Sequence, residues 1–248
     1  MKRMKCVISY DGTNFSGFQV QPLKRTVQSE LEKALKKIHK GQDIRIFPSG
    51  RTDRGVHAIR QTIHFDTSNQ MNEKSWKKAL NALLPEDVYV KETKHVPSSF
   101  HARFSAIEKE YRYVILNTQE PDVFRRHYAY HFPYALDMTQ MRKACHYLEG
   151  KHDFTAFSSA RSTVKGSKVR TLYEASCQQK GSDIMFVFRG DGFLYHMVRI
   201  LVGTLLEVGQ GKRKPEHIKQ LLKQQDRKQS GKTAPPQGLY LWDVTYPE

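Results

Sequence analysis

The stretch KCVISYDGTNFSGFQVQPLKRTVQSELEKALKKI, residues 5–38, decides how the first half of the chain is expected to fold. Its first part, Lys5–Tyr10, alternates in the manner of a half-buried strand. Apolar side chains then recur at helical spacing from Val27 through Leu31 and Leu35, behind Thr26, which is suited to cap a helix. The stretch therefore predicts a strand followed by an amphipathic helix.

The remaining elements continue this order through both halves of the chain. In the first half, further strands are expected at Ile44–Pro48, Gln61–Asp66 and Asp87–Lys91, with a helix near Glu73–Leu84. In the second half, strands are expected at Tyr111–Leu116, Lys168–Gln178, Ile184–Arg189 and Leu239–Tyr246, and helices at Met138–Leu148, Phe193–Val208 and Pro215–Lys223. Each half reads βαββαβ, and the second half has one extra helix. We therefore expect an α+β protein of two fused ferredoxin-like subdomains, residues 1–103 and 104–248, with the helices packed on one face of the sheet.

The charge of the chain indicates a polyanionic partner. It contains 41 lysines and arginines against 25 aspartates and glutamates, which gives a formal net charge of +16 and a pI near 9.7. This charge exceeds what solubility requires, so the summed field attracts polyanions, and nucleic acid is the first candidate. The alternative is a basic surface without a specific partner.

Cysteine usage and hydropathy bear on the compartment. Cys6, Cys145 and Cys177 lie far apart and show no metal-ligand spacing, so we expect neither a structural zinc nor a disulfide framework. The first residues lack the apolar run of a signal peptide, and no later run has the length of a membrane-spanning helix. We expect a cytoplasmic protein that does not contact the membrane.

One acidic residue stands out in the predicted loop SGRTDRGVHA, residues 49–58. Asp53 lies between Arg51 and Arg54, where a carboxylate that faced a polyanion would repel it. A nearby arginine keeps a carboxylate ionised and directs it, as nucleophilic or general-base catalysis requires. The alternative is an Asx-type turn in which Asp53 bonds nearby amides.

Two other stretches contain candidate site residues. Arg199 lies within GFLYHMVRILVGTLLEVG, a helix so apolar that this cation must find a carboxylate or extend to the surface. We expect it to pair with Asp53. Tyr111 and Tyr113 share one face of a strand among basic residues, which suits stacking on an unpaired base, although a tyrosine on a strand, taken alone, more often belongs to the core.

Motifs for other chemistries are missing from the sequence. The histidines show no HxH or HExxH spacing, no serine lies in a nucleophile elbow, and there is no Walker loop or dinucleotide fingerprint. We expect His57 and His196 to be structural. The residues therefore predict a protein without cofactor or metal that carries a reactive carboxylate on a polyanion-binding surface.

Several blocks of the sequence together resemble the tRNA pseudouridine synthase A family. They are YDGTNFSGFQVQ at Tyr10–Gln21, GRTDRGVHA at Gly50–Ala58, FHARFSAIEKEYRY at Phe100–Tyr113, FLYHMVRILVGTLLEVGQGK at Phe193–Lys212 and TAPPQGLYL at Thr233–Leu241. The blocks occur in the order of the family and extend over the whole chain.

The resemblance implies a role for each site residue. Asp53 matches the catalytic aspartate, and Arg51 in the same block is similar to a site arginine of the family. Tyr111 matches the tyrosine that stacks on the target base, Arg199 the arginine that pairs with the aspartate, and Leu239 an apolar residue beside the pocket. The resemblance further implies that the two subdomains share a mixed, mainly antiparallel sheet with the active site in the cleft between them.

The resemblance also implies a reaction and partners. Members isomerise uridine to pseudouridine in the anticodon stem-loop of tRNA, at positions 38 to 40, as homodimers that bind tRNA across both subunits without cofactor or metal. Two alternatives stay open: a member that acts on another RNA, and a non-catalytic RNA-binding or chaperone relative. The catalytic aspartate could attack the base, attack the sugar or remove a sugar proton, and the residues do not choose among these routes.

Overall fold

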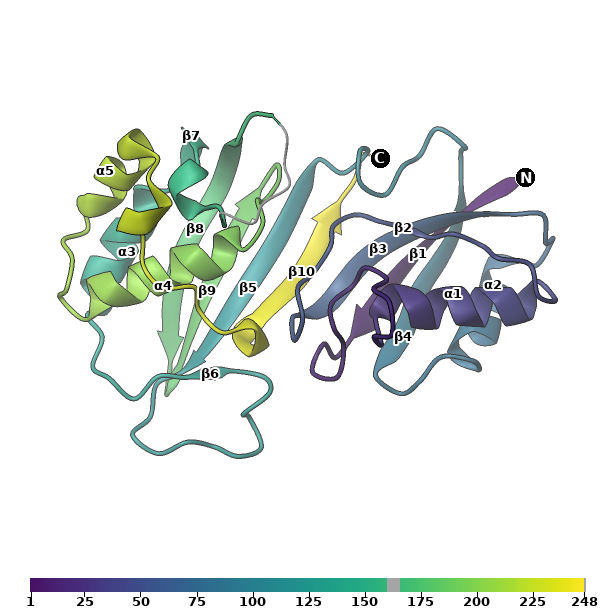
Figure 1. The fold of residues 1–248 in the computed structure, drawn as a ribbon, viewed down its shortest axis with the longest axis horizontal. Coiled ribbons are helices and arrows are strands. Elements are labelled where there is room, and N and C mark those ends of the chain that lie inside the picture. The colour runs from purple at the N-terminus through teal and green to yellow at the C-terminus, as the bar shows by residue number, and fades with distance from the viewer. Residues whose placement is uncertain (160–165, 248) are drawn as a thin grey trace. The chain divides into compact units, whose positions relative to one another are not determined.

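The computed structural model describes residues 1–159 and 166–247. The chain divides into two compact units, of which the first comprises Met1–Ile107 and Tyr240–Glu248 and the second Glu108–Leu239. Each unit has its own strands and its own helices (Figure 1). The α+β class predicted from the sequence is confirmed.

The first unit has the predicted βαββαβ order. Its elements are β1 (Lys2–Tyr10), α1 (Val27–Ile38), β2 (Phe47–Pro48), β3 (His57–Thr67), α2 (Glu73–Asn81) and β4 (Val88–Val96), followed at the end of the chain by β10 (Leu239–Thr245). Strand β1 pairs antiparallel with both β3 and β4, and the short β2 pairs antiparallel with β3. The order β4-β1-β3-β2 places β1 inside the sheet, which explains why Met4, Cys6 and Ile8 are fully buried.

Helix α1 begins where the sequence predicts. The Thr26 side chain accepts the backbone N–H of Ser29 at 3.2 Å, and the Ser29 hydroxyl accepts the backbone N–H of Thr26 at 3.1 Å. This reciprocal capping satisfies two of the donors that every helix leaves unpaired at its N-terminus. Helices α1 and α2 contact each other, and Figure 1 shows them lying side by side on the sheet.

The second unit contains more elements than the sequence predicts. They are β5 (Glu108–Leu116), β6 (Tyr130–His131), α3 (Met138–His146), β7 (Gly150–Asp153), η1 (Thr155–Phe157), β8 (Val169–Lys180), β9 (Asp183–Gly190), α4 (Met197–Gly209), α5 (His217–Gln224), η2 (Arg227–Gln229) and η3 (Pro236–Gly238). The sheet order is β6-β5-β9-β8-β7, with β9 antiparallel to both β5 and β8. Helix α3 packs on β8 and against α4 (Figure 1). The strands β6 and β7 are too short to leave a periodic signal.

The last strand pairs with β3. The sequence order places this strand at the end of the second half, and in the structure β10 pairs parallel with β3 of the first unit, Tyr240 opposite His57 and Leu241 opposite Ala58. The physical reason is that an alternating strand can pair with any free edge, so its partner depends on the tertiary fold.

Two further features concern the cysteines and the length of the helices. Cys6, Cys145 and Cys177 are buried and free of disulfides. Among the described residues no helix is both long and apolar enough to cross a membrane.

Candidate active site

The Asp53 loop, residues 49–56, connects β2 to β3 and is fastened to β3 at its start. The backbone N–H of Ser49 donates to the carbonyl of Thr62 at 2.8 Å, and the Ser49 hydroxyl donates to Gln61 Oε1 at 2.5 Å. The amide of Gln61 in turn donates to the carbonyl of Gly50 at 2.8 Å. Both side chains are buried, so these bonds fix the direction in which the chain leaves the sheet.

A tight turn then presents Asp53. The backbone N–H of Val56 donates to the carbonyl of Asp53 at 3.2 Å, which closes a four-residue turn. Gly55 occupies the third position with a φ of 76°, the left-handed conformation that a turn of type II requires there. Asp53 is the first residue of this turn and is half-buried, whereas Arg51 and Arg54 on either side are exposed.

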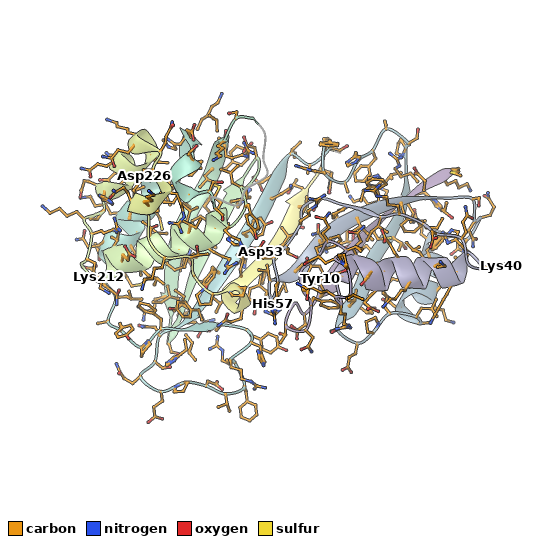
Figure 2. The ribbon with its side chains drawn as sticks, viewed as in Figure 1. Tyr10, Lys40, Asp53, His57, Lys212 and Asp226 are labelled. Atoms are coloured by element: carbon orange, nitrogen blue, oxygen red, sulfur yellow. The ribbon has the colours of Figure 1, made fainter. Side chains whose placement is uncertain are left out.

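The segment Tyr10–Phe18 lies against the loop and supports it. The hydroxyl of Tyr10 lies 2.7 Å from Oγ1 of Thr52, and the backbone N–H of Phe18 donates to the Thr52 carbonyl at 3.0 Å. Thr52 is therefore held through its side chain and its backbone. Figure 2 shows Tyr10 and Asp53 in the same region of the first unit. The two sequence blocks that contain these residues are far apart in the chain but contact each other in the fold.

Two glycines make this close approach possible. A Cβ on Gly17 would lie 3.0 Å from the Thr52 carbonyl oxygen and 3.3 Å from the carbonyl carbon of Asp53, and the φ of Gly17 is +99°. A Cβ on Gly12 would overlap the carbonyl oxygen of Val56. Side chains at these positions would push the Asp53 loop away from the segment beneath it.

His57 supports the same segment. The buried Nδ1 of His57 lies 3.0 Å from the backbone nitrogen of Gly12 and 3.1 Å from Oδ1 of Asp11. The ring also stacks on Tyr240, the second residue of β10, at a centroid separation of 4.8 Å. These contacts agree with a structural role, and Figure 2 labels His57 beside Asp53.

In the second unit, Tyr111 and Tyr113 lie on the buried face of β5. Tyr111 is 8% exposed and packs edge-to-face against Phe193, with ring centroids 4.8 Å apart. Tyr113 is fully buried and donates its hydroxyl to the carbonyl of Pro235 at 2.7 Å. Burial raises the pKa of Tyr113, and the positive charge of Arg199 opposes that rise.

Arg199 is fixed by the chain that precedes β10. Its Nε donates to the carbonyl of Ala234 at 2.7 Å, and the backbone N–H of Ala234 donates to the carbonyl of Arg199 at 3.0 Å. This approach depends on glycines as well, because a Cβ on Gly203 would overlap the Lys232 carbonyl and one on Gly231 would come within 2.7 Å of the Thr204 backbone. Arg199 is thus half-buried on a mostly buried helix, with its Nε held by the chain before β10.

The segment 234–239 joins the site residues of the second unit. It contacts Arg199 through Ala234 and Tyr113 through Pro235, and it ends at the buried Leu239. Gly238 packs against β5 so closely that a Cβ there would lie 2.6 Å from the Val114 carbonyl oxygen. The predicted residues therefore form two groups, Arg51 and Asp53 in the first unit and Tyr111, Arg199 and Leu239 in the second. The pairing of Asp53 with Arg199 joins the two groups and stays a prediction.

The support beneath the Asp53 loop comes from residues that the sequence alone does not assign to a site. They are Tyr10, Gly12, Gly17 and Thr52, of which the first three lie in the block YDGTNFSGFQVQ. The available signal was the pair of glycines directly after a predicted strand, which indicates backbone in close contact with another part of the chain. Within residues 1–159 and 166–247, no group of three or more His, Cys, Asp or Glu side chains could hold a metal ion.

Comparison with known proteins identifies the family. A family profile described as "tRNA pseudouridine synthase" matches residues 6–105 and 144–247. The chain is 59% identical over 248 residues to a "tRNA pseudouridine synthase A" of Oceanobacillus iheyensis, a match that covers 100% of this chain and 98% of the relative. Proteins of the same description from Anoxybacillus flavithermus and Bacillus subtilis are 58% and 53% identical, over 99% and 98% of this chain and 99% of each relative. The protein therefore belongs to the tRNA pseudouridine synthase A family of pseudouridine-forming isomerases.

Proposed function

We propose that this protein converts uridine to pseudouridine in the anticodon stem-loop of tRNA, at positions 38 to 40, with Asp53 as the catalytic residue. The observation that carries the proposal is the fixed presentation of Asp53. Its loop is held by Ser49 and Gln61 on one side and by Tyr10 on the other, while the adjoining arginines remain exposed. A carboxylate needs this orientation if it is to react within a polyanionic substrate.

The reaction defines what the site must do. The bond between N1 of uracil and C1′ of ribose breaks, the uracil turns, and C5 forms a bond to the same C1′. C5 then loses its proton and N1 gains one, so the product is an isomer of the substrate. The reaction needs no oxidant, reductant or ATP, because bond breaking is followed by bond making in the same molecule.

The site residues divide these tasks. The target uridine leaves its stack at a cost of a few kcal/mol, and stacking on Tyr111 recovers part of that cost. Asp53 acts as an ionised group, whether it attacks the base, attacks the sugar or removes a sugar proton. Arg199 pairs with the Asp53 carboxylate and keeps it ionised. Arg51 contacts the RNA backbone beside the target, and Leu239 supplies an apolar wall to the uracil pocket.

The assembly follows the family resemblance. The enzyme acts in the cytoplasm as a homodimer, and one tRNA contacts both subunits. The net charge of +16 supports binding of a large polyanion, since counterions released from the tRNA favour the complex.

The test uses the purified full chain and an unmodified tRNA transcript that carries uridine at positions 38, 39 and 40. Pseudouridines are mapped after incubation by chemical tagging and reverse transcription. The expected stops lie at those positions and are absent from a transcript with cytidine there. Stops elsewhere in the tRNA would overturn the assigned positions, and pseudouridine formed only in a parallel reaction with ribosomal RNA would overturn the assigned substrate. Tight binding without any isomerisation would support the non-catalytic alternative.

A further inference from the structure

Outside the Asp53 loop, the first unit carries a row of aromatic rings that the reaction does not use. Phe47, His101 and Phe104 form this row, which we call the aromatic ledge together with Arg45 and Arg103. The ring centroids of Phe47 and His101 lie 5.8 Å apart, and those of His101 and Phe104 lie 4.4 Å apart. Phe104, at the end of the row, is 75% exposed.

The two arginines of the ledge lie over its rings. The guanidinium carbon of Arg45 is 5.4 Å from the centroid of Phe47, and that of Arg103 is 5.6 Å from the centroid of Phe104. Other arginines of this unit, such as Arg3 with Asp66, pair with carboxylates. Within the described part of the chain, no carboxylate pairs with Arg45 or Arg103. The ledge therefore combines exposed π surface with positive charge that internal ion pairs do not neutralise.

The backbone beneath Phe104 is held in place. Nδ1 of His101 accepts the backbone N–H groups of Arg103 and Phe104 at 3.1 and 3.4 Å. Nδ1 of His64 accepts the N–H of Ala102 at 3.1 Å, and its ring stacks on Phe47 with centroids 5.0 Å apart. Burial, with help from Arg3 and Arg103, lowers the pKa of His101, so that its ring stays neutral at pH 7. A ledge fixed in this way requires little ordering when a ligand binds.

A groove connects the ledge to the Asp53 loop. Its volume is about 490 Å³, and Arg45, Phe47 and Arg51 all line it. Two acidic residues also line the groove, but both have partners. Glu32 accepts the backbone N–H of Ile46 at 3.1 Å, and Asp43 pairs with Lys36 at 2.9 Å. The groove therefore extends from Arg51 of the Asp53 loop to Arg45 and Phe47 of the aromatic ledge.

We propose that the aromatic ledge binds an unpaired nucleotide of the RNA substrate outside the reactive position, with its base stacked on Phe104 and its phosphates beside Arg45 and Arg103. Proteins that bind single-stranded RNA use interleaved aromatic and cationic side chains, because every base has a π face and every phosphodiester linkage carries a negative charge. The net charge of the chain favours this occupant over a basic or apolar protein partner. This inference rests on the proposed function, since it assigns the ledge to the same RNA.

The test measures the Kd of a fluorescein-labelled unmodified tRNA transcript by anisotropy for full-length Phe104→Ala, Phe104→Leu and Phe104→Trp. Loss of one stacked base raises Kd about tenfold in the Ala and Leu variants, and the Trp variant restores it. The single-turnover rate at saturating enzyme stays within twofold of the wild type, because the ledge lies outside the reactive position. Tyr89→Ala is the matched control: it removes another exposed ring of this unit, one that lies 5.7 Å from the ammonium of Lys77, and leaves Kd unchanged.

Several outcomes would overturn the proposal. An unchanged Kd for Phe104→Ala would show that no base stacks there, and wild-type affinity for Phe104→Leu would show apolar contact in place of stacking. A change in oligomeric state, measured for the free variants by light scattering, would assign the ledge to contact with a second copy. If the wild type forms no pseudouridine but Phe104→Ala still weakens binding, the proposed function fails and the ledge remains an RNA-binding surface.

Discussion

The hydroxyl of Tyr10 lies 2.7 Å from Oγ1 of Thr52, so the last residue of β1 is bonded to the residue that precedes Asp53. Both residues are buried, and burial raises the pKa of Tyr10, which keeps its hydroxyl protonated. A hydrogen bond between two neutral side chains in the core of the first unit thus holds the Asp53 loop against the end of β1.

Tyr10→Phe should lower the free energy of unfolding by about 1–3 kcal/mol, because Thr52 Oγ1 loses its buried partner. We also expect a lower kcat with little change in tRNA affinity, since the loop is displaced but the RNA-binding surface remains. Urea titration and steady-state kinetics measure the two effects. Tyr89→Phe removes a hydroxyl from an exposed ring and serves as the control. Equal effects from both changes would contradict the role given to Tyr10.

Gly17→Ala and Gly41→Ala form a matched pair, because both glycines have a φ of +99°. Each variant places an L residue in that conformation, which lowers the free energy of unfolding by about 1–2 kcal/mol. Only Gly17→Ala also forces a Cβ to within 3.0 Å of the Thr52 carbonyl, whereas nothing lies within 4 Å of a Cβ at position 41. We expect both variants to lower the free energy of unfolding by at least the cost of this backbone conformation, and only Gly17→Ala to lower kcat, by tenfold or more. Retained activity in both variants would argue that the loop tolerates displacement.

Asp53→Asn should abolish turnover and leave the Kd for tRNA within a few-fold of the wild type. The amide keeps the shape of the side chain but cannot act as nucleophile or base. Pseudouridine formation and filter binding measure the two properties. Glu86→Gln is a suitable control, because Glu86 is an exposed carboxylate of the same unit that does not line the groove. Appreciable residual activity in Asp53→Asn would remove Asp53 from the reaction.

The proposed pairing of Asp53 with Arg199 can be tested by a double-mutant cycle on stability. If the two side chains interact, Arg199→Gln lowers the free energy of unfolding less in the Asp53→Asn background than in the wild type. We expect a coupling energy of about 1 kcal/mol or more for such a pair. The bond from Arg199 to the Ala234 carbonyl is lost in both backgrounds and cancels. Additive effects would contradict the pairing.

Acid should weaken the structure that carries the aromatic ledge. Burial, aided by the charges of His101 and Arg3, lowers the pKa of His64 from 6.5 to about 4. His64 therefore binds a proton near pH 6.5 in the unfolded chain but only near pH 4 in the folded chain. The free energy of unfolding falls as the pH drops through this interval. Protonation of Nδ1 would also remove the bond that it accepts from the N–H of Ala102.

Denaturant titrations from pH 7 to pH 4 measure this effect. His64→Gln removes the titrating group while keeping a polar side chain, so we expect a smaller decrease in stability over the same interval. His101 contributes in the same direction, since its pKa is also lowered by burial. An identical pH profile for His64→Gln and wild type would show that His64 does not titrate as proposed.

The sequence by itself determined the local structure and predicted which residue reacts. Apolar periodicity predicted α1 and the βαββαβ order of the first unit, because a helix and a strand repeat at different spacings. The capping signal at Thr26 predicted the start of α1. The odd chemistry of a single acid between arginines indicated Asp53, and the motif blocks identified the family.

Tertiary structure decided which distant segments meet. The pattern of β10 fits several neighbours, and its pairing with β3 depends on which strand edge the folded chain leaves open. The contacts of Tyr10 and Gly17 with the Asp53 loop likewise join two segments that are far apart in the sequence, and neither segment's pattern predicts the other as its partner. The aromatic ledge arises in the same way, since Phe47 and Phe104 become neighbours only through the histidines between them. Spacing along a chain encodes local geometry, whereas contacts between segments follow from how the whole core is buried.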